Sequence, residues 1–143
     1  MIIALASDHG GFSLKEEIEK HLIGRGYEVI DLGTHSQESV DYPVYGKRIG
    51  EAVAGGTADV GVAFCGTGIG ISIACNKVKG IRCAVAVNSY MAEMAKRHNN
   101  ANILALGGRI LSVEQATEFV DIWLDTEFEE DRHARRVRLL DEM

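Results

Sequence analysis

Proline is almost absent from this sequence, and no stretch of low complexity interrupts it. Pro43 is the single proline among 143 residues, and 46% of the residues are hydrophobic against 25% that are charged. Disordered chains are rich in proline and charge and poor in hydrophobic residues. The composition therefore excludes a disordered chain, and the length predicts one globular domain that spans residues 1–143.

Cysteine is also scarce. Cys65, Cys75 and Cys83 are odd in number, and they follow neither the CxxC pattern nor the spacing of zinc ligands. We therefore expect no disulfide framework and no metal site, and a reducing compartment suits the chain best.

Long apolar runs and an excess of basic residues are missing as well. The apolar start of the chain has no basic residues before it and ends at Asp8, too early for a signal peptide or a membrane helix. The formal net charge of −6 opposes general attraction to nucleic acid, and the arginine-dense stretch Arg132–Arg138 is too short to change that. These features predict a cytoplasmic protein that binds neither membranes nor nucleic acid.

Short apolar runs alternate along the chain with longer segments of helical period. This order is typical of βαβ units and predicts an α/β protein, with a three-layer α/β/α, Rossmann-like fold around a five-stranded parallel sheet. The expected strands are Ile2–Ser7, Glu28–Leu32, Val60–Cys65, Cys83–Val87 and Ile103–Leu106.

Capping residues indicate where several helices begin. Ser13–Glu16 and Ser112–Gln115 have the capping-box pattern, in which two side chains bond reciprocally to backbone N–H groups. Asp41 precedes Pro43 at the expected start of another helix. The last helix, about Arg132–Leu140, is followed by no strand, so it is free to reach over a partner subunit.

Reactive and flexible residues follow two of the expected strands. The first strand runs into Asp8 and His9, and the third runs into a loop that contains Gly66, Gly68 and Gly70. Ligands of open α/β sheets bind outside the carboxyl ends of the strands. A glycine-rich loop before a helix can surround an anion with N–H groups, although close packing of helix and strand explains a GxGxG pattern equally well.

Cys65 stands directly before this loop. The start of a helix favours a thiolate, which can act as a nucleophile, a base or a redox sensor. A single cysteine at the end of a buried strand is also commonly a small core residue, and Cys75 and Cys83 fit only that interpretation.

One further histidine and several arginines are candidates. His98 lies at a helix end, where it can serve catalysis or complement the helix dipole. Arg132 and Arg136 are four residues apart and can grip a phosphate from one helix face, although a solvated basic face explains them as well. Arg109 is another candidate anion ligand, and His133 by itself indicates neither a catalytic nor a surface role.

Six motifs stand out together, namely Ser7–Gly11, Asp41–Pro43, Cys65–Ala74, Asn76–Lys77, Arg97–Asn99 and Arg132–Val137. Together they resemble the type B ribose-5-phosphate isomerases, and the resemblance covers nearly the whole chain. That family also includes allose-6-phosphate isomerases and the subunits of galactose-6-phosphate isomerase. The resemblance implies a parallel-sheet α/β/α fold and a homodimer with sites shared between its subunits, or a tetramer of such dimers.

The resemblance also implies a role for each candidate residue. Cys65 would move a proton between C1 and C2 of an open-chain sugar phosphate, and Thr67 with the loop amides would stabilise the enediolate. His98 would open the sugar ring with help from Asp8. No cofactor is implied, because this chemistry needs a base, an oxyanion cradle and an acid/base for ring opening. The residues that would bind sugar hydroxyls or phosphate are His9, Tyr42, Asn99, Arg109, Arg132 and Arg136.

Two alternatives to ribose-5-phosphate isomerisation stay open. One is the same reaction on a six-carbon sugar phosphate, either allose 6-phosphate or galactose 6-phosphate, and the other is a non-catalytic phosphosugar-binding or redox-sensing module. A branch of the family uses a glutamate in the loop instead of the cysteine, but Ile71 occupies that position here, so Cys65 has no substitute. The full set of site residues in one chain favours a homo-oligomer that acts on ribose 5-phosphate.

Overall fold

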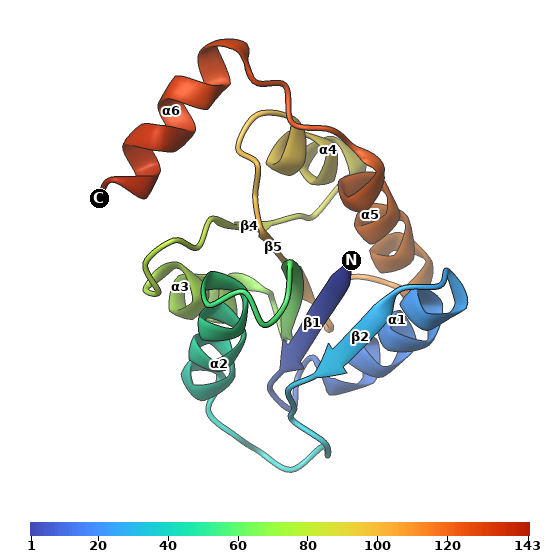
Figure 1. The fold of residues 1–143 in the computed structure, drawn as a ribbon. Coiled ribbons are helices and arrows are strands. Elements are labelled where there is room, and N and C mark those ends of the chain that lie inside the picture. Colours follow the sequence, from blue (N-terminus) through green and yellow to red (C-terminus); the bar gives the residue numbers. More distant parts are fainter.

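Five parallel strands form one sheet in the computed structural model, which describes all of residues 1–143 (Figure 1). The strands are β1 (Ile2–Ser7), β2 (Glu28–Asp31), β3 (Val60–Cys65), β4 (Cys83–Val85) and β5 (Ile103–Gly107). Their order in the sheet is β2-β1-β3-β5-β4, so the chain builds from β1 to one edge and then from β3 to the other. The predicted five-stranded parallel sheet is confirmed.

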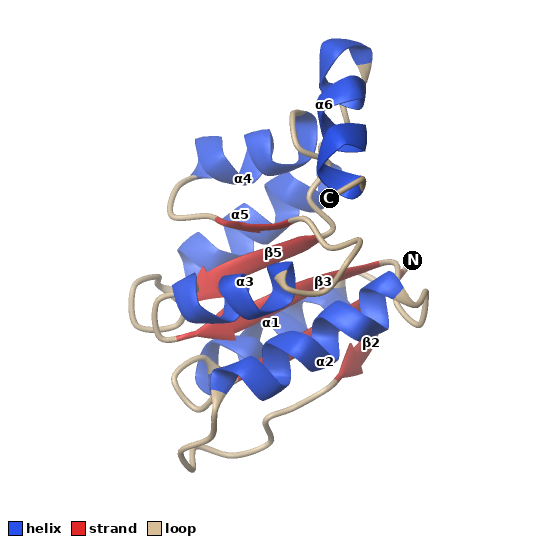
Figure 2. Ribbon diagram, turned by 90° about the vertical axis from the view of Figure 1, so that its left-hand side faces the viewer, coloured by secondary structure: helices blue, strands red, loops and turns tan.

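Helices cover both faces of this sheet. They are α1 (Phe12–Gly24), α2 (Tyr42–Ala54), α3 (Ile69–Asn76), α4 (Ser89–Arg97), α5 (Val113–Asp125) and α6 (Asp131–Asp141). α1, α4 and α5 pack together on one face, and α2 and α3 pack together on the other (Figure 2). α6 stands apart from both layers (Figure 1). The predicted three-layer fold is therefore confirmed, with one helix outside the layers.

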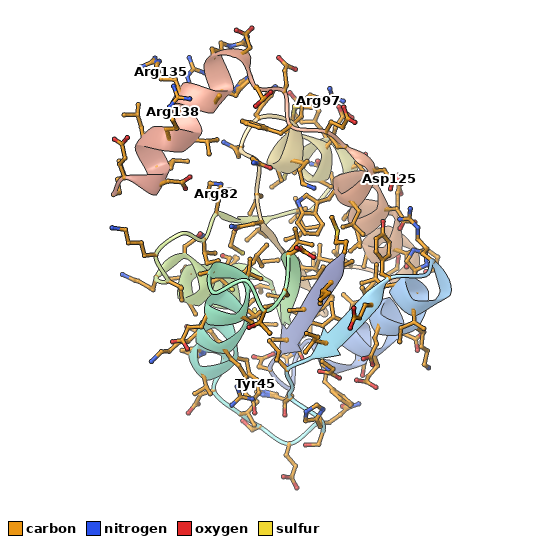
Figure 3. The ribbon with its side chains drawn as sticks, viewed as in Figure 1. Tyr45, Arg82, Arg97, Asp125, Arg135 and Arg138 are labelled. Atoms are coloured by element: carbon orange, nitrogen blue, oxygen red, sulfur yellow. The ribbon has the colours of Figure 1, made fainter.

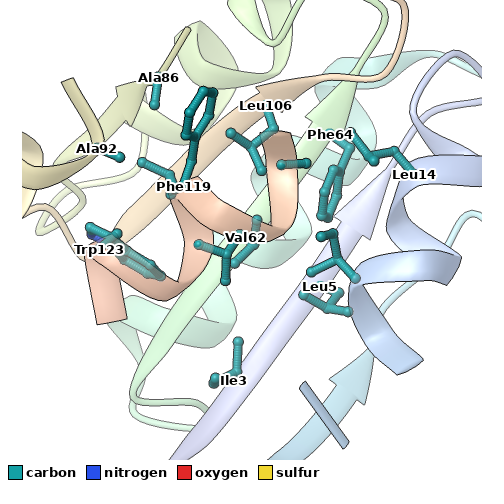
Figure 4. Packing of buried hydrophobic residues seen from close by; sticks show 14 of the residues in the cluster. Ile3, Leu5, Leu14, Val62, Phe64, Ala86, Ala92, Leu106, Phe119 and Trp123 are labelled. Carbon is teal, nitrogen blue, oxygen red and sulfur yellow. The ribbon is translucent and has the colours of Figure 1, made fainter. Parts of the chain in front are cut away.

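The central strands are apolar on both faces because helices bury both. Ile3 and Leu5 of β1 point into the layer of α1 and α5, whereas Ala4 and Ala6 point into the layer of α2 and α3. Figure 4 shows the first of these layers, where Trp123 of α5 is the largest fully buried side chain. Burying large apolar side chains of this kind contributes about 1.5–3 kcal/mol each.

One of the two predicted capping boxes is present. The Ser112 Oγ accepts a hydrogen bond from the Gln115 backbone N–H at 3.1 Å, and the Gln115 Oε1 accepts one from the Ser112 N–H at 2.9 Å. The helix expected after Asp41 begins at Tyr42 with Pro43 in its first turn, as predicted.

The other capping box, at Ser13–Glu16, was predicted wrongly. α1 begins two residues earlier than that box requires, at Phe12, and Gly11 caps it without a side-chain hydrogen bond. The physical reason is the preceding turn, because Asp8 Oδ1 already accepts the Gly11 N–H at 3.2 Å. Ser13 is exposed, and its hydroxyl accepts a hydrogen bond from the Gln37 side chain instead.

Element ends differ slightly from the prediction. β2 and β4 stop at Asp31 and Val85, short of the predicted ends, because both are edge strands with a single neighbour. β5 extends to Gly107, and the last helix begins at Asp131. None of the helices combines the length and the apolar character that crossing a membrane requires.

Candidate active site

Three loops meet at the carboxyl ends of β1, β3 and β5, next to the point where the strand order reverses. Backbone hydrogen bonds join them, from the Asp8 N–H to the Phe64 oxygen at 3.2 Å and from the Gly108 N–H to the Cys65 oxygen at 2.8 Å. A Cβ at Gly108 would lie 2.5 Å from the carbonyl oxygen of Gly10, so the loops can approach this closely only with glycine there. Open α/β sheets bind their ligands at such a position.

Cys65 is the last residue of β3 and is only 5% exposed. Its Sγ accepts a hydrogen bond from the Gly68 N–H at 3.1 Å. Gly68 has a φ of 82°, which glycine adopts without strain, and it is the cap of α3. The sulfur therefore lies among backbone N–H donors at the start of a helix, where the sequence predicted it.

The loop after Cys65 contains N–H groups without partners. Those of Gly66, Thr67, Gly70 and Ile71 make no hydrogen bond within the chain. Unpaired N–H groups at a helix start attract an anion or a developing oxyanion. The Thr67 Oγ1 accepts the Ile69 N–H at 3.2 Å, so its own hydroxyl proton is available to a ligand. These are the groups that would form the predicted cradle.

Asp8 shapes the neighbouring loop after β1. It is 7% exposed, and its Oδ1 accepts the N–H groups of Gly10 and Gly11 at 2.9 and 3.2 Å. Its Oδ2 makes no hydrogen bond within the chain. One carboxylate oxygen therefore holds the turn, and the other is available to a substrate.

His9 is held in one tautomer. The Val40 N–H donates to His9 Nδ1 at 3.1 Å, so Nδ1 is an acceptor and the ring proton of the neutral imidazole lies on Nε2. Val40 belongs to the segment between β2 and α2, which no local pattern relates to His9. The contact leaves His9 with an N–H donor that suits a phosphate oxygen.

Tyr42 and Arg109 complete the group at this edge of the sheet. The Tyr42 ring lies against Gly70, where an added Cβ would be 2.8 Å from the ring. The Arg109 guanidinium lies 3.1 Å from the Cβ position of Gly66 and 3.4 Å from that of Gly10. A guanidinium beside unpaired N–H groups makes the crevice electropositive and suited to an anion.

Four predicted site residues are not part of this group. His98 caps the end of α4, Asn99 follows it, and both precede β5. Arg132 and Arg136 are exposed on α6. The structure places these four residues near the amino ends of the strands, whereas the crevice lies at the carboxyl ends.

The two groups are separated by the length of the central strands. β3 and β5 pair from Gly61 with Ile103 to Cys65 with Gly107, which spans about 13 Å at about 3.3 Å per residue. In Figure 1 the arrowheads of β1 and β2 point away from α4 and α6. α6 is tied to the same end of the strands, because Arg82 just before β4 pairs with Asp141 at 2.7 Å. Arg82 lies below α6 in Figure 3. One chain therefore does not bring His98 to Cys65.

His133 is a neighbour of the second group whose role the sequence did not indicate. It lies in the first turn of α6, is 6% exposed, and stacks on His98 with ring centroids 4.1 Å apart and an interplanar angle of 12°. Burial, reinforced by the nearby His98 and Arg132, lowers the pKa of His133 below its ordinary value. No sequence pattern connects two histidines so far apart in the chain.

A cluster of carboxylates outside the crevice has the spacing of a cation site. One oxygen from each of Glu16, Glu19 and Asp31 lies within 4.8 Å of the others. The buried Lys15 ammonium bonds to Glu16 at 2.9 Å and to Asp31 at 2.6 Å, so a lysine supplies the neutralising charge. Burial, Asp31 and Glu16 together raise the pKa of Glu19. These contacts explain the cluster without a metal ion.

The fold and the crevice together are those of an α/β enzyme, with a thiol, a carboxylate and an imidazole beside groups that favour an anion. Comparison with known proteins supplies the family. The family described as Ribose/Galactose Isomerase matches residues 3–140. Ribose-5-phosphate isomerase B of Escherichia coli is 49% identical over 138 residues, which are 96% of this chain and 93% of the relative.

One further relative and one solved structure are also similar to this chain. The galactose-6-phosphate isomerase subunit LacB of Clostridium acetobutylicum is 39% identical over 137 residues, which are 96% of this chain and 79% of the relative. The structure of Clostridium thermocellum ribose-5-phosphate isomerase B has a TM-score of 0.98 and 57% identity, covering 99% of this chain and 96% of the other. The chain belongs to the ribose/galactose isomerase family, and within it to the type B ribose-5-phosphate isomerases, which are aldose–ketose isomerases.

Proposed function

We propose that this protein interconverts D-ribose 5-phosphate and D-ribulose 5-phosphate through a cis-enediolate. The observation that carries the proposal is the Cys65 sulfur beside four backbone N–H groups without partners. Proton transfer between adjacent carbons needs a base next to an oxyanion cradle. Relatives named ribose-5-phosphate isomerase B, at 49% and 57% identity, support this substrate.

Cys65 is the proton-transfer base in this mechanism. Its thiolate takes the proton from C2 of the open-chain aldose, the electron pair forms a C1–C2 double bond, and the oxygen on C1 becomes negatively charged. The unpaired loop N–H groups and the Thr67 hydroxyl stabilise that oxygen. The sulfur then returns the proton to C1 while the proton of the C2 hydroxyl moves to the oxygen on C1, which leaves the ketose.

The phosphate is held far from the reacting carbons. His9 and Arg109 contribute from the chain that carries Cys65, and Arg132 and Arg136 contribute from a second chain. Binding energy at the phosphate positions C1 and C2 against Cys65, which lowers the barrier of the proton transfer.

Ring opening is assigned to His98 with help from Asp8. It moves the proton of the C1 hydroxyl to the ring oxygen, while Tyr42 and Asn99 bind sugar hydroxyls. His98 and Cys65 lie at opposite ends of the strands. The two residues therefore meet only when a second copy of the chain supplies one of them. The working enzyme in this proposal is therefore a homodimer with shared sites.

Exposed apolar side chains on α3 and α4 support an interface with a second chain. Ile69 and Ile73 of α3 are 57% and 56% exposed, and Tyr90 at the start of α4 is 69% exposed. Large apolar side chains gathered on a surface mark sites of protein association.

Turnover by the purified protein tests the proposed function. We expect conversion of ribose 5-phosphate without added metal or cofactor, with a higher kcat/KM than for allose 6-phosphate or galactose 6-phosphate. The similarity to LacB is the observation that favours a six-carbon substrate. A reversed order of kcat/KM would move the assignment to that substrate, and no turnover of any of the three would reject the proposed function.

A further inference from the structure

The stacked pair of His98 and His133 joins two elements that are otherwise in loose contact. His98 ends α4, and His133 lies in the first turn of α6. The segment before α6 is fastened to the same place, because the Glu129 N–H donates to the Arg97 oxygen at 2.9 Å. The ring planes are 12° from parallel and the ring centroids are 4.1 Å apart, so each imidazole covers one face of the other.

The two rings of the pair differ in their surroundings. His133 is 6% exposed, and its Nε2 is buried without a hydrogen-bond partner, 3.9 Å from the Glu129 carboxylate. His98 is only partly buried. Burial together with the charges of His98, Arg132 and Arg136 outweighs Glu129 and lowers the pKa of His133. His98 is therefore the member of the pair whose edge a substrate can reach.

Orientation matters for the task assigned to His98. A group that moves a proton between two oxygens of a sugar ring must present an edge nitrogen within hydrogen-bond reach of both. A buried flat ring against the face of His98 fixes the plane of His98 while leaving its nitrogens accessible. Arg132 and Arg136 belong to the same two turns of α6 as His133, so the stack also aligns His98 with the proposed phosphate ligands.

We propose that His133 is the positioning residue of His98, and that the stack between them holds the ring-opening imidazole in its productive plane. This inference rests on the proposed function, because it assumes that His98 opens the sugar ring. His133 itself touches no substrate in this proposal.

A double-mutant cycle tests this role. His133→Leu removes the flat ring at similar volume, and we expect kcat with ribose 5-phosphate to fall about 10–100-fold, the cost of misplacing a reacting group. In a His98→Asn background the same substitution should change kcat by less than about twofold, because residues that act through one another are not additive. His133→Phe keeps a flat ring and should retain most of the activity.

The outcomes separate the inference from the proposed function. Equal fold losses from His133→Leu in both backgrounds, or no loss in the wild-type background, would overturn the positioning role. If His133→Leu does not fold, His133→Gln replaces it in the same cycle. As an independent readout, the Hε1 proton resonance of His98 should shift in His133→Leu through the lost ring current and stay nearly in place in His133→Phe. A wild-type protein that does not isomerise ribose 5-phosphate would reject the proposed function first.

Discussion

Cys65 and His98 lie at opposite ends of the strands of one parallel sheet. Cys65 ends β3 where it pairs with Gly107, whereas His98 precedes Ile103, the first residue of β5. All the carboxyl ends of parallel strands lie at one edge of the sheet. A residue just before one strand is therefore separated from a residue at the end of the neighbouring strand by the length of the strands. A single chain thus contains two incomplete halves of the proposed site.

The first prediction follows from that separation. Mixing Cys65→Ala protein with His98→Asn protein should restore activity after subunits exchange, to about one quarter of the wild-type value, because half the dimers then contain one intact site. Cys65→Ala mixed with Arg136→Ala should recover in the same way. Cys65→Ala mixed with Arg109→Ala is the control without recovery, since both residues belong to one crevice. Exchange is verified by mass, and a fully active monomer would contradict the shared site.

The second prediction concerns the base. Cys65→Ala should lower kcat by about 10²–10⁴-fold, the usual cost of losing a general base, while phosphate binding and the fold persist. The loop keeps its N–H groups because the backbone defines them. Cys75→Ala is the matched control, as Cys75 is buried in the core and should leave turnover nearly unchanged. Activity of Cys65→Ala within a few-fold of wild type would remove the thiol from the mechanism.

The third prediction separates ring opening from proton transfer. His98→Asn should impair turnover of ribose 5-phosphate far more than turnover of erythrose 4-phosphate, which is too short to form the same ring. The thiol and its cradle serve both substrates, whereas only the first needs His98. Equal losses of kcat/KM on the two substrates would assign His98 to another step.

The fourth prediction concerns pH and stability. The pKa of His133 is lowered in the folded protein, so the unfolded chain, with a histidine pKa of about 6.5, takes up the proton first as the pH falls. Stability therefore decreases as the pH falls from about 7.5 through 6.5 toward the lowered pKa, and it is insensitive to this group above that window. His133→Phe should flatten that part of the curve of unfolding free energy against pH, measured with urea. An unchanged curve would show that other groups cause the dependence.

The fifth prediction tests the close approach of the loops. Gly108→Ala places a Cβ 2.5 Å from the Gly10 oxygen, so it should destabilise the fold by about 1–3 kcal/mol and lower activity. Gly24→Ala is the control, because nothing lies within 4 Å of its Cβ position and alanine is the better helix former. Thermal unfolding of the two variants gives the comparison. Equal melting temperatures would mean that the loops have room to separate.

Local sequence patterns predict much of the fold. The apolar runs of β1, β3 and β5 are strands buried on both faces, and each run predicts this without its neighbours. The Ser112 capping box forms because its two partners lie within one helical turn. The same logic failed at Ser13, since Asp8 engages the Gly11 N–H first. Two local signals competed there, and only the folded turn decided between them.

For the site, the sequence alone determined which residue types are present and that Asp8, His9 and Cys65 follow strands, so their meeting at one edge was predictable from parallel topology. Tertiary structure decided what depends on contacts between distant segments. Val40 sets the tautomer of His9, and burial where His133 stacks on His98 lowers the pKa of His133. Hydrogen bonding and burial depend on neighbours in space, and a linear pattern specifies neighbours only over a few turns or along one strand.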